Sequence, residues 1–391
     1  MKKLLSLFLM LMAFGVAVSG VRSVKVKTLA APAESLSAVS EAAYLTDFNS
    51  GTVIYAKNET ERLPIASMCK IMTLLLTFES IDSGSLSLDD TVTVSAEAAG
   101  MGGSQIFLDA NKPYEVRELV KGIVVASAND ASYALAEQIS GSEELFVAEM
   151  NAKCKELGMN DTHFSNCTGL PKAQQYSCAK DVSKMFSELL THKDYFTFSR
   201  IWMDEIHHDG GRVTEISNTN KLIRFYEGCD GGKTGYTSEA GHCLAASAQR
   251  KGMRLVSVVI KAPDGKTRFN DVSTMFNYGF ANYENKLILD CEKPLEIPVT
   301  VTGGKQDSVL GVPAESYYLF SARNEKIALN IDFTPDEKVK APVEKGQRIG
   351  SLTVEKDGIL VKEIPVLAYE TVEKQTYFDI VKNIIDNWKL F

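Results

Sequence analysis

Apolar residues recur at the spacing of an α-helix in several stretches of the chain. The clearest stretch begins at Ser67, where positions 71, 72, 74, 75, 78 and 81 are apolar and Gly84 follows as a stop signal. The same spacing predicts further helices over 115–139, 143–157, 179–190 and 269–283.

Strands are predicted before, between and after these helices. Residues 42–47 and 52–57 flank Asn49-Ser-Gly51 and predict a hairpin, and apolar runs over 243–248 and 254–261 predict two later strands. A hairpin, several helices and late antiparallel strands together are typical of an α+β domain.

The pattern changes near residue 286, where short alternating runs replace the helical spacing. These runs are punctuated by proline and glycine, and they lie at 295–301, 316–320, 327–333, 348–354 and 359–366. Short strands with such turn signals predict a small all-β sandwich.

The N-terminal pattern predicts an export signal. Lys2 and Lys3 precede an apolar run over 4–18, which is shorter than the roughly 20 residues that span a bilayer. We therefore expect a cleaved signal peptide over 1–19, with an uncleaved membrane anchor as the alternative, and a polar tether over 20–36. The mature protein is expected to work outside the cytoplasm.

The last residues predict a strongly amphipathic helix over 376–391. One side carries Tyr377, Phe378, Ile380, Val381, Ile384, Ile385, Trp388 and Phe391, and polar residues lie opposite. The helix is interpreted either as docking on its own protein or as lying in the plane of a membrane. The aromatic-rich apolar side favours the membrane surface.

Composition narrows the functional classes. The 391 residues are 45% hydrophobic and 24% charged, which suits a globular chain of two domains. Lys and Arg number 42 against 50 Asp and Glu, giving a net charge of −8, so no nucleic-acid partner is expected. The seven cysteines form no Cys-x-x-Cys pair and the five histidines show no ligand spacing, so neither a disulfide framework nor a metal site is predicted.

Ser67 and Lys70 form the first candidate for chemistry. Positions i and i+3 of a helix lie on one face, so the lysine amine could accept the proton of the serine hydroxyl. Ser177 and Lys180 have the same spacing, and Ser67 is equally well interpreted as a helix N-cap. The spacing alone does not decide between these interpretations.

Two further polar stretches interrupt apolar sequence. Ser127-Ala-Asn129 places a hydroxyl and an amide in the middle of a buried-looking helical region, where polar groups need partners or a purpose. Lys233-Thr-Gly235 resembles the end of a phosphate-binding loop, but Glu227 stands where that motif needs glycine and a strand follows. A nucleotide site is therefore not expected.

Taken in order, these three stretches resemble the motifs of serine penicillin-binding proteins and β-lactamases. The surrounding sequence is similar to the low-molecular-mass D-alanyl-D-alanine carboxypeptidases of peptidase family S11, at Ser127-Ala-Asn-Asp-Ala131, Glu156-Leu-Gly-Met159, Thr168-Gly-Leu-Pro171, Asn218-Thr-Asn-Lys-Leu222 and Asp230-Gly-Gly-Lys-Thr-Gly-Tyr-Thr237. The resemblance covers nearly the whole chain, including the β-rich C-terminal domain and the amphipathic tail.

The resemblance implies an α+β fold: a serine β-lactamase/penicillin-binding-protein-like catalytic domain, with an antiparallel sheet and helices, followed by a small all-β sandwich. The expected parts are a signal peptide at 1–19, a tether at 20–36, a catalytic transpeptidase-like domain at 37–285, a β-sandwich domain at 286–375 and a membrane-associating helix at 376–391. The implied location is the outer face of the cytoplasmic membrane or the cell wall space.

The implied reaction removes the terminal D-alanine from peptidoglycan stem pentapeptides without a cofactor. Ser67 would attack the carbonyl between the two D-alanines, and Lys70, held neutral by burial and a neighbouring cation, would accept its proton. Ser127 would relay a proton to the leaving D-alanine, Asn129 would position the substrate amide and Lys233 would supply positive potential. Penicillins, which imitate the dipeptide, should acylate the same serine.

The resemblance also implies a substrate-binding strand. The backbone N–H groups of the nucleophile and of Tyr236 would form the oxyanion hole, and Thr234, Gly235 and Thr237 would line the substrate. Arg268 matches a family arginine thought to hold the terminal carboxylate, a task suited to a bidentate guanidinium, although a surface arginine is the alternative.

Two other functions remain as alternatives. A class A-like β-lactamase would need a Glu-x-x-Leu-Asn motif, and Glu156-Leu-Gly-Met-Asn160 misses it at Met159 and falls within a predicted helix. A non-catalytic muropeptide- or β-lactam-binding module would release no D-alanine. Cys69 and His242 also lie near the motifs, and both are interpreted as structural.

Overall fold

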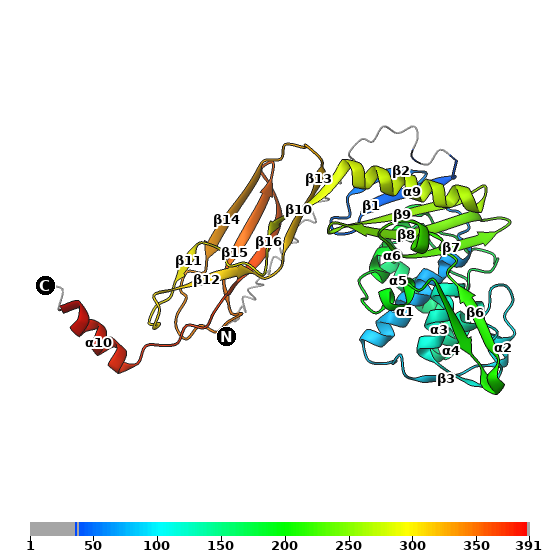
Figure 1. The fold of residues 1–391 in the computed structure, drawn as a ribbon, viewed down its shortest axis with the longest axis horizontal. Helices are drawn as coiled ribbons and strands as arrows, with labels where there is room; N and C mark the ends of the chain where they lie inside the picture. Colours follow the sequence, from blue (N-terminus) through cyan, green and yellow to red (C-terminus); the bar gives the residue numbers. More distant parts are fainter. Residues whose placement is uncertain (1–35, 37–38, 389–391) are drawn as a thin grey trace, which may run out of the picture.

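The computed structural model describes residue 36 and residues 39–388. The predicted signal peptide and the predicted tether, apart from residue 36, lie outside the described residues, as do the last three residues of the predicted tail helix. The described chain forms an N-terminal α+β domain, an elongated β domain beside it and a separate terminal helix (Figure 1).

A five-stranded antiparallel sheet organises the first domain. Its order is β2-β1-β9-β8-β7, so the predicted hairpin pairs with the last strands of the domain. The strands are β1 (Ala42–Asp47), β2 (Val53–Lys57), β7 (Cys229–Thr237), β8 (Gly241–Arg250) and β9 (Met253–Ala262). β7 is an edge strand, which leaves one side of its backbone free of sheet partners.

Helices pack on both faces of this sheet. α9 (Gly265–Asn282) covers one face, and α6 (Ala179–Leu189) packs against β1 and β9 on the other (Figure 1). α9 begins four residues earlier than predicted because the Asp264 carboxylate caps it by accepting the N–H of Thr267.

A helical region lies beyond α6, and α1 (Lys70–Asp82) is at its centre. The residues of α1 from 70 to 78 are all buried, including its lysine and two threonines, so this part of the helix is enclosed on every side. The neighbouring helices are α3 (Val116–Lys121), α4 (Asn129–Ser140) and α5 (Glu143–Glu156). Shorter elements complete the domain: β3 (Thr91–Thr93), α2 (Ala96–Ala99), β4 (Pro113–Glu115), α7 (Tyr195–Ser199), β5 (Met203–His207), β6 (Val213–Ser217) and α8 (Leu222–Phe225).

The helical pattern predicted over 115–139 is broken where the sequence indicated. One π-helical turn (Gly122–Ala126) follows α3, and Ser127 then adopts a left-handed backbone with φ 65° before α4 begins. A single π turn is often found at functional sites because it re-aims the following side chains.

The C-terminal domain is all-β, as predicted. Its larger sheet has the order β11-β12-β16-β15-β14, and β10 and β13 form a second sheet. The strands are β10 (Tyr283–Leu289), β11 (Pro298–Thr300), β12 (Ser308–Pro313), β13 (Tyr317–Ala322), β14 (Leu329–Pro335), β15 (Arg348–Lys356) and β16 (Ile359–Ala368). β10 and β12 were not predicted, and the expected boundary between 285 and 286 falls inside β10.

Contacts with the preceding segment hold the start of α6. Cys178 is the N-cap residue of this helix, and the Ser177 hydroxyl shares a hydrogen bond with Thr162 at 2.8 Å. Asp181 in the first turn is buried, and its carboxylate accepts hydrogen bonds from the backbone N–H of Asp161 and the hydroxyl of Thr162.

The terminal helix α10 (Tyr377–Trp388) lies apart from both domains (Figure 1). Tyr377 and Phe378 are 76% and 82% exposed, so the described part of the helix does not bury these rings on its own protein. Within residues 36 and 39–388, no helix combines the length and the apolar character that crossing a bilayer requires.

Candidate active site

Ser67 lies in a short 3₁₀ turn (Ala66–Cys69) directly before α1. Lys70 Nζ donates a hydrogen bond to Ser67 Oγ at 3.0 Å, so the predicted i and i+3 contact is made. The N-cap interpretation is wrong, because Cys69 is the N-cap residue of α1 and no side chain caps that helix. Ala66 has φ 47°, a strained value for alanine that is often found beside reactive groups.

Lys70 is fully buried, and its amine donates hydrogen bonds to two oxygen atoms. Besides Ser67 Oγ, its amine donates to the carbonyl of Thr168 at 2.5 Å. Burial lowers the pKa of Lys70 to about 8, because an ammonium group loses its hydration in the interior. The neutral amine, which can accept a proton, is therefore far more populated near neutral pH than the neutral amine of an exposed lysine.

A second serine and lysine lie close to the first pair. Lys233 Nζ donates to Ser127 Oγ at 2.7 Å and to the carbonyl of Thr234 at 3.1 Å. Burial lowers the pKa of Lys233 well below its usual value, and repulsion by Lys70 and Arg268 adds to the effect. A neighbouring cation was expected to lower the pKa of Lys70. Burial is instead what lowers the pKa of Lys70, and the repulsion between the two lysines lowers the pKa of Lys233.

Strand β7 brings the third motif against the Ser67 turn. A Cβ added at Gly235 would lie 2.4 Å from the carbonyl oxygen of Ile65 and 3.3 Å from the backbone nitrogen of Met68. Only glycine permits this close approach of strand and turn. The strand is anchored at its other end, where the buried Asp230 carboxylate pairs with Arg254 at 2.8 Å.

The remaining residues of β7 differ in exposure. Thr234 is buried, and Thr237 is half-buried with its hydroxyl accepting the N–H of Ala240 at 3.0 Å. Tyr236 is 59% exposed and its ring lies against that of His242, with centroids 4.4 Å apart. His242 thus supports an exposed ring at the rim of the site, as its structural interpretation predicted.

Asn129 begins α4 beside the left-handed Ser127. Its amide Nδ2 donates to the carbonyl of Gly102 at 2.6 Å, and its backbone N–H donates to the carbonyl of Ser104 at 2.7 Å. Its Oδ1 is buried and has no hydrogen-bond partner among the described residues. A free buried amide oxygen is suited to accept an N–H from a bound peptide.

Arg268 lies in the first turns of α9 and reaches toward β7. It donates to the carbonyls of Gly235 at 3.2 Å and Cys243 at 3.4 Å, and it is half-buried rather than on the open surface. No acidic group within the described part of the chain forms an ion pair with it. The guanidinium charge beside the substrate strand is therefore not neutralised by a carboxylate of the protein.

The loop over 166–175 is the part of the site that the sequence did not predict. Gly169 (φ +81°) lies so close to the nucleophile that an added Cβ would be 2.0 Å from the Ala66 carbonyl oxygen and 2.9 Å from the Ser67 nitrogen. Asn166 holds the loop by accepting the N–H groups of Thr168 and Gly169. The turn-forming run at Thr168-Gly-Leu-Pro171 was the available signal.

A cavity of about 550 Å³ opens beside this loop. Its lining includes Ala66, Gly169, Leu170, Tyr176 and Thr237. A cavity that adjoins both the Ser67 turn and the end of the edge strand β7 suits a peptide that extends along the strand.

Other candidate groups near the site are structural. Cys69 is fully buried, its thiol donates to the Asn166 carbonyl at 3.2 Å, and burial raises its pKa to about 12, so it is not a rival nucleophile. Gly232 and Lys233 lie in the middle of a strand and not before a helix, which excludes the phosphate-binding interpretation.

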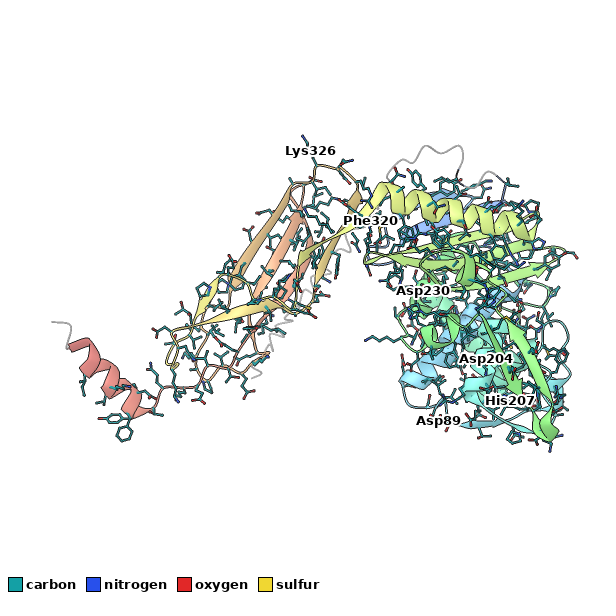
Figure 2. The ribbon with its side chains drawn as sticks, in the orientation of Figure 1. Asp89, Asp204, His207, Asp230, Phe320 and Lys326 are labelled. Carbon is teal, nitrogen blue, oxygen red and sulfur yellow. The ribbon has the colours of Figure 1, made fainter. Side chains whose placement is uncertain are left out.

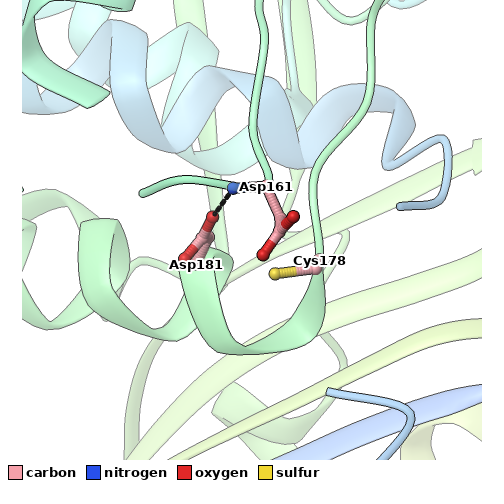
Figure 3. A group of neighbouring side chains, drawn as sticks. All are labelled: Asp161, Cys178 and Asp181. Carbon is pink, nitrogen blue, oxygen red and sulfur yellow. Dashed lines mark hydrogen bonds between the residues drawn. The ribbon is translucent and has the colours of Figure 1, made fainter. Parts of the chain in front are cut away.

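Asp161, Cys178 and Asp181 form a compact group with possible ligand atoms within 4.8 Å of one another (Figure 3). Protein contacts account for this group: Asp181 accepts the backbone N–H of Asp161 at 2.9 Å, and Asp161 pairs with Arg62 at 3.1 Å. Burial raises the pKa of the Cys178 thiol to about 12, which disfavours the thiolate that a metal needs. The group joins the start of α6 to the preceding loop.

Comparison with known proteins shows the family to which this chain belongs. Residues 26–264 match the peptidase S11 family model, described as D-alanyl-D-alanine carboxypeptidase. The chain belongs to this family. Residues 283–374 match the model of the C-terminal domain of penicillin-binding protein 5.

Individual relatives and structures agree with the family. The chain is 40% identical to the D-alanyl-D-alanine carboxypeptidase DacF of Bacillus subtilis, over 90% of each chain, and 31% identical to DacC of Escherichia coli, over 87% of this chain and 86% of DacC. Penicillin-binding protein 5 of Haemophilus influenzae has a similar structure, with a TM-score of 0.66 and 29% identity over 86% of this chain and 98% of that one.

The predicted fold and enzyme class are therefore confirmed: this S11 protein is a serine D-alanyl-D-alanine carboxypeptidase. The β-lactamase alternative is not favoured. Glu156, its candidate deacylation residue, is on α5, where its carboxylate pairs with Lys153 at 2.7 Å.

Proposed function

We propose that Ser67 is the nucleophile of this carboxypeptidase and that Lys70 is its general base. Ser67 Oγ attacks the carbonyl carbon of the penultimate D-alanine, and its proton passes to the neutral amine of Lys70. The 3.0 Å contact between Lys70 Nζ and Ser67 Oγ, within a buried site that lowers the pKa of Lys70, is the observation that carries this proposal.

Ser127 and Lys233 then serve the leaving group. As the C–N bond breaks, the departing amine takes the proton of Ser127 Oγ, which Lys233 replaces through its 2.7 Å hydrogen bond. The free D-alanine leaves. Water then attacks the ester carbonyl and gives a proton to Lys233 through Ser127, while Lys70 returns its proton to Ser67 Oγ as the ester bond breaks, so both lysines regain their starting states. Burial lowers the pKa of both lysines, so the Lys70 amine is more often neutral and free to accept a proton, and a protonated Lys233 gives up its proton more readily.

Four groups position the substrate in this proposal. The backbone N–H groups of Ser67 and Tyr236 stabilise the oxyanion, and the free Oδ1 of Asn129 accepts the substrate amide. Thr234, Gly235 and Thr237 line the edge of β7, along which the peptide extends. Arg268, which lacks an acidic partner among the described residues, binds the terminal carboxylate.

Penicillins acylate Ser67 by the same first step in this proposal. Their strained amide presents a carbonyl to the nucleophile, and the ring-opened product stays attached, so it blocks the path by which D-alanine leaves. The stem peptide ending in D-Ala-D-Ala and β-lactams are thus expected to compete for one site.

We also propose that the enzyme works at the outer face of the cytoplasmic membrane, exported by residues 1–19 and held by α10. The exposed apolar residues of α10 support an in-plane association, since their burial among lipid headgroups and chains is favourable.

D-Alanine release from a diacetyl-L-Lys-D-Ala-D-Ala peptide tests the catalytic assignment. Wild-type protein should release D-alanine, and Ser67→Ala should reduce the rate by at least about 10³-fold, since the nucleophile is lost. Ser177→Ala is the matched control, because Ser177 precedes Lys180 at the same spacing, and it should retain activity. Comparable rates for Ser67→Ala and wild type would contradict the proposal.

A further inference from the structure

Asp130 is a fully buried carboxylate in the first turn of α4, next to Asn129. It accepts the backbone N–H groups of Ile106 at 3.2 Å, Leu108 at 3.1 Å and Ala131 at 2.9 Å. Between the first two donors, Phe107 has a left-handed backbone with φ 60°, so the chain turns around the carboxylate. Burial raises the pKa of Asp130, and these backbone donors oppose that shift because they stabilise the charged carboxylate.

The same chain segment also contacts Asn129. The carbonyls of Gly102 and Ser104 accept its side-chain and backbone N–H groups. Segment 102–108 therefore crosses the start of α4 and is fastened there by two consecutive residues. These contacts fix the turn that aims Ser127, whose own backbone is left-handed.

The charge of Asp130 has no direct ion-pair partner in the part of the chain that the structure describes. Its electrostatic effect reaches Lys70 and His208, and the two lysines of the site repel each other. Cys69 and Cys167 also face Lys70, but burial raises the pKa of Cys69 to about 12 and that of Cys167 well above its usual value, so both thiols are neutral near pH 8. Asp130 is the remaining anion among the groups that act on Lys70.

We propose that Asp130 is a positioning residue of the active site with two roles: its carboxylate ties segment 102–108 to the Ser127–Asn129 turn, and its charge offsets positive charge at Lys70. This inference rests on the proposed function, because it assigns Asp130 a role through Ser127, Asn129 and Lys70. Within the described residues, the hydrogen bonds of Asp130 all go to backbone N–H groups and none to Ser67.

The two roles can be separated by two substitutions. Asp130→Asn keeps the shape of the side chain but removes its charge. It also places an amide N–H donor where the carboxylate accepted backbone N–H groups. Asp130→Glu keeps the charge but displaces it by one methylene. Glu144→Gln is the matched control, since Glu144 is an exposed acid in the first turn of α5.

The experiment measures acylation of the full chain by a fluorescent penicillin between pH 6 and 10, together with amide hydrogen exchange over residues 102–108. Asp130→Asn should move the rising limb of the profile to lower pH, because Lys70 loses the anion that stabilises its charged form. Both Asp130 variants should lower the maximal rate by tenfold or more, on the order expected for a misplaced catalytic group. Both should also speed exchange over 102–108, whereas Asp130→Glu should keep the midpoint pH and Glu144→Gln should change nothing.

A folded Asp130→Asn variant with the wild-type rate and midpoint pH would overturn the inference. If that variant does not fold, a folded Asp130→Glu with unchanged acylation and unchanged exchange would overturn it equally. A flat profile for the wild type would instead contradict the role proposed for Lys70, and the exchange of residues 102–108 would then decide the inference alone.

Discussion

Burial gives the two lysines of the site their chemistry. Lys70 and Lys233 are 0% and 2% exposed, and their pKa values fall because no water solvates their ammonium groups. Motif spacing predicted both lysines as members of the site. Motif spacing could not predict which lysine has its pKa lowered by repulsion from the other. That depends on distances between β7 and α1, which no local pattern contains.

The pKa of Lys70 predicts the pH dependence of acylation. The base is active when neutral, so the acylation rate should rise about tenfold per pH unit below pH 8 and level off above about pH 9. Acylation by a fluorescent penicillin from pH 6 to 9 measures this profile. A rate that is constant over that range would exclude Lys70 as the base.

Gly169 offers a test of the packing around the nucleophile. Gly169→Ala should slow acylation by about 100-fold or more, because the new methyl group displaces the Ala66–Ser67 backbone. Gly84→Ala is the control: its φ is also positive, at +75°, but its Cβ would meet nothing within 4 Å. The control should lose about 1–2 kcal/mol of stability from backbone strain while its acylation rate stays unchanged. Equal acylation rates for the two variants would contradict the close packing.

At the scale of elements, the periodic pattern predicted the helices and strands that bury one continuous apolar face. The helix predicted from Ser67 begins at Lys70, because the strained turn over 66–69 precedes it. β12 was missed because its sequence, Ser-Val-Leu-Gly-Val-Pro, contains a glycine and a proline that the pattern treats as turn signals. Its pairing with β11 and β16 overrides those signals.

The helix α10 is the element whose function is tested most simply. Phe378→Asp should lower partitioning of the protein into phosphatidylcholine vesicles by at least about tenfold, since the transfer of one aromatic ring is lost. Lys382→Gln alters the exposed polar side of the helix and should leave partitioning nearly unchanged. Vesicle co-sedimentation measures both. Unchanged partitioning of Phe378→Asp would contradict membrane association through α10.

At the scale of the whole molecule, the two domains are joined more closely than the sequence suggested. Tyr283 begins β10 directly after α9, and its ring stacks on Phe320 of β13 with centroids 5.2 Å apart. Phe320 lies at the junction of the domains and packs in the same apolar cluster as α9 (Figure 2). The composition change near 286 could not reveal this, because the connecting strand pairs with residues that lie 28 to 39 positions later in the chain.

The junction predicts a difference between two neighbouring aromatic residues of β13. Phe320→Ala should lower the free energy of unfolding by roughly 3–5 kcal/mol, because it removes a ring that is 6% exposed. Tyr318→Ala, on the same strand but 42% exposed, should cost about 1 kcal/mol or less. Urea unfolding compares them, and equal losses would contradict the packing of Phe320 between the domains.

Covalent labelling by a fluorescent penicillin tests the central claim, that Ser67 is the nucleophile, most directly. The wild type and Ser177→Ala should both carry the label after denaturing electrophoresis, and Ser67→Ala should carry none, since the ester can form only on the missing hydroxyl. Persistent labelling of Ser67→Ala, or loss of labelling in Ser177→Ala with the fold intact, would contradict the account.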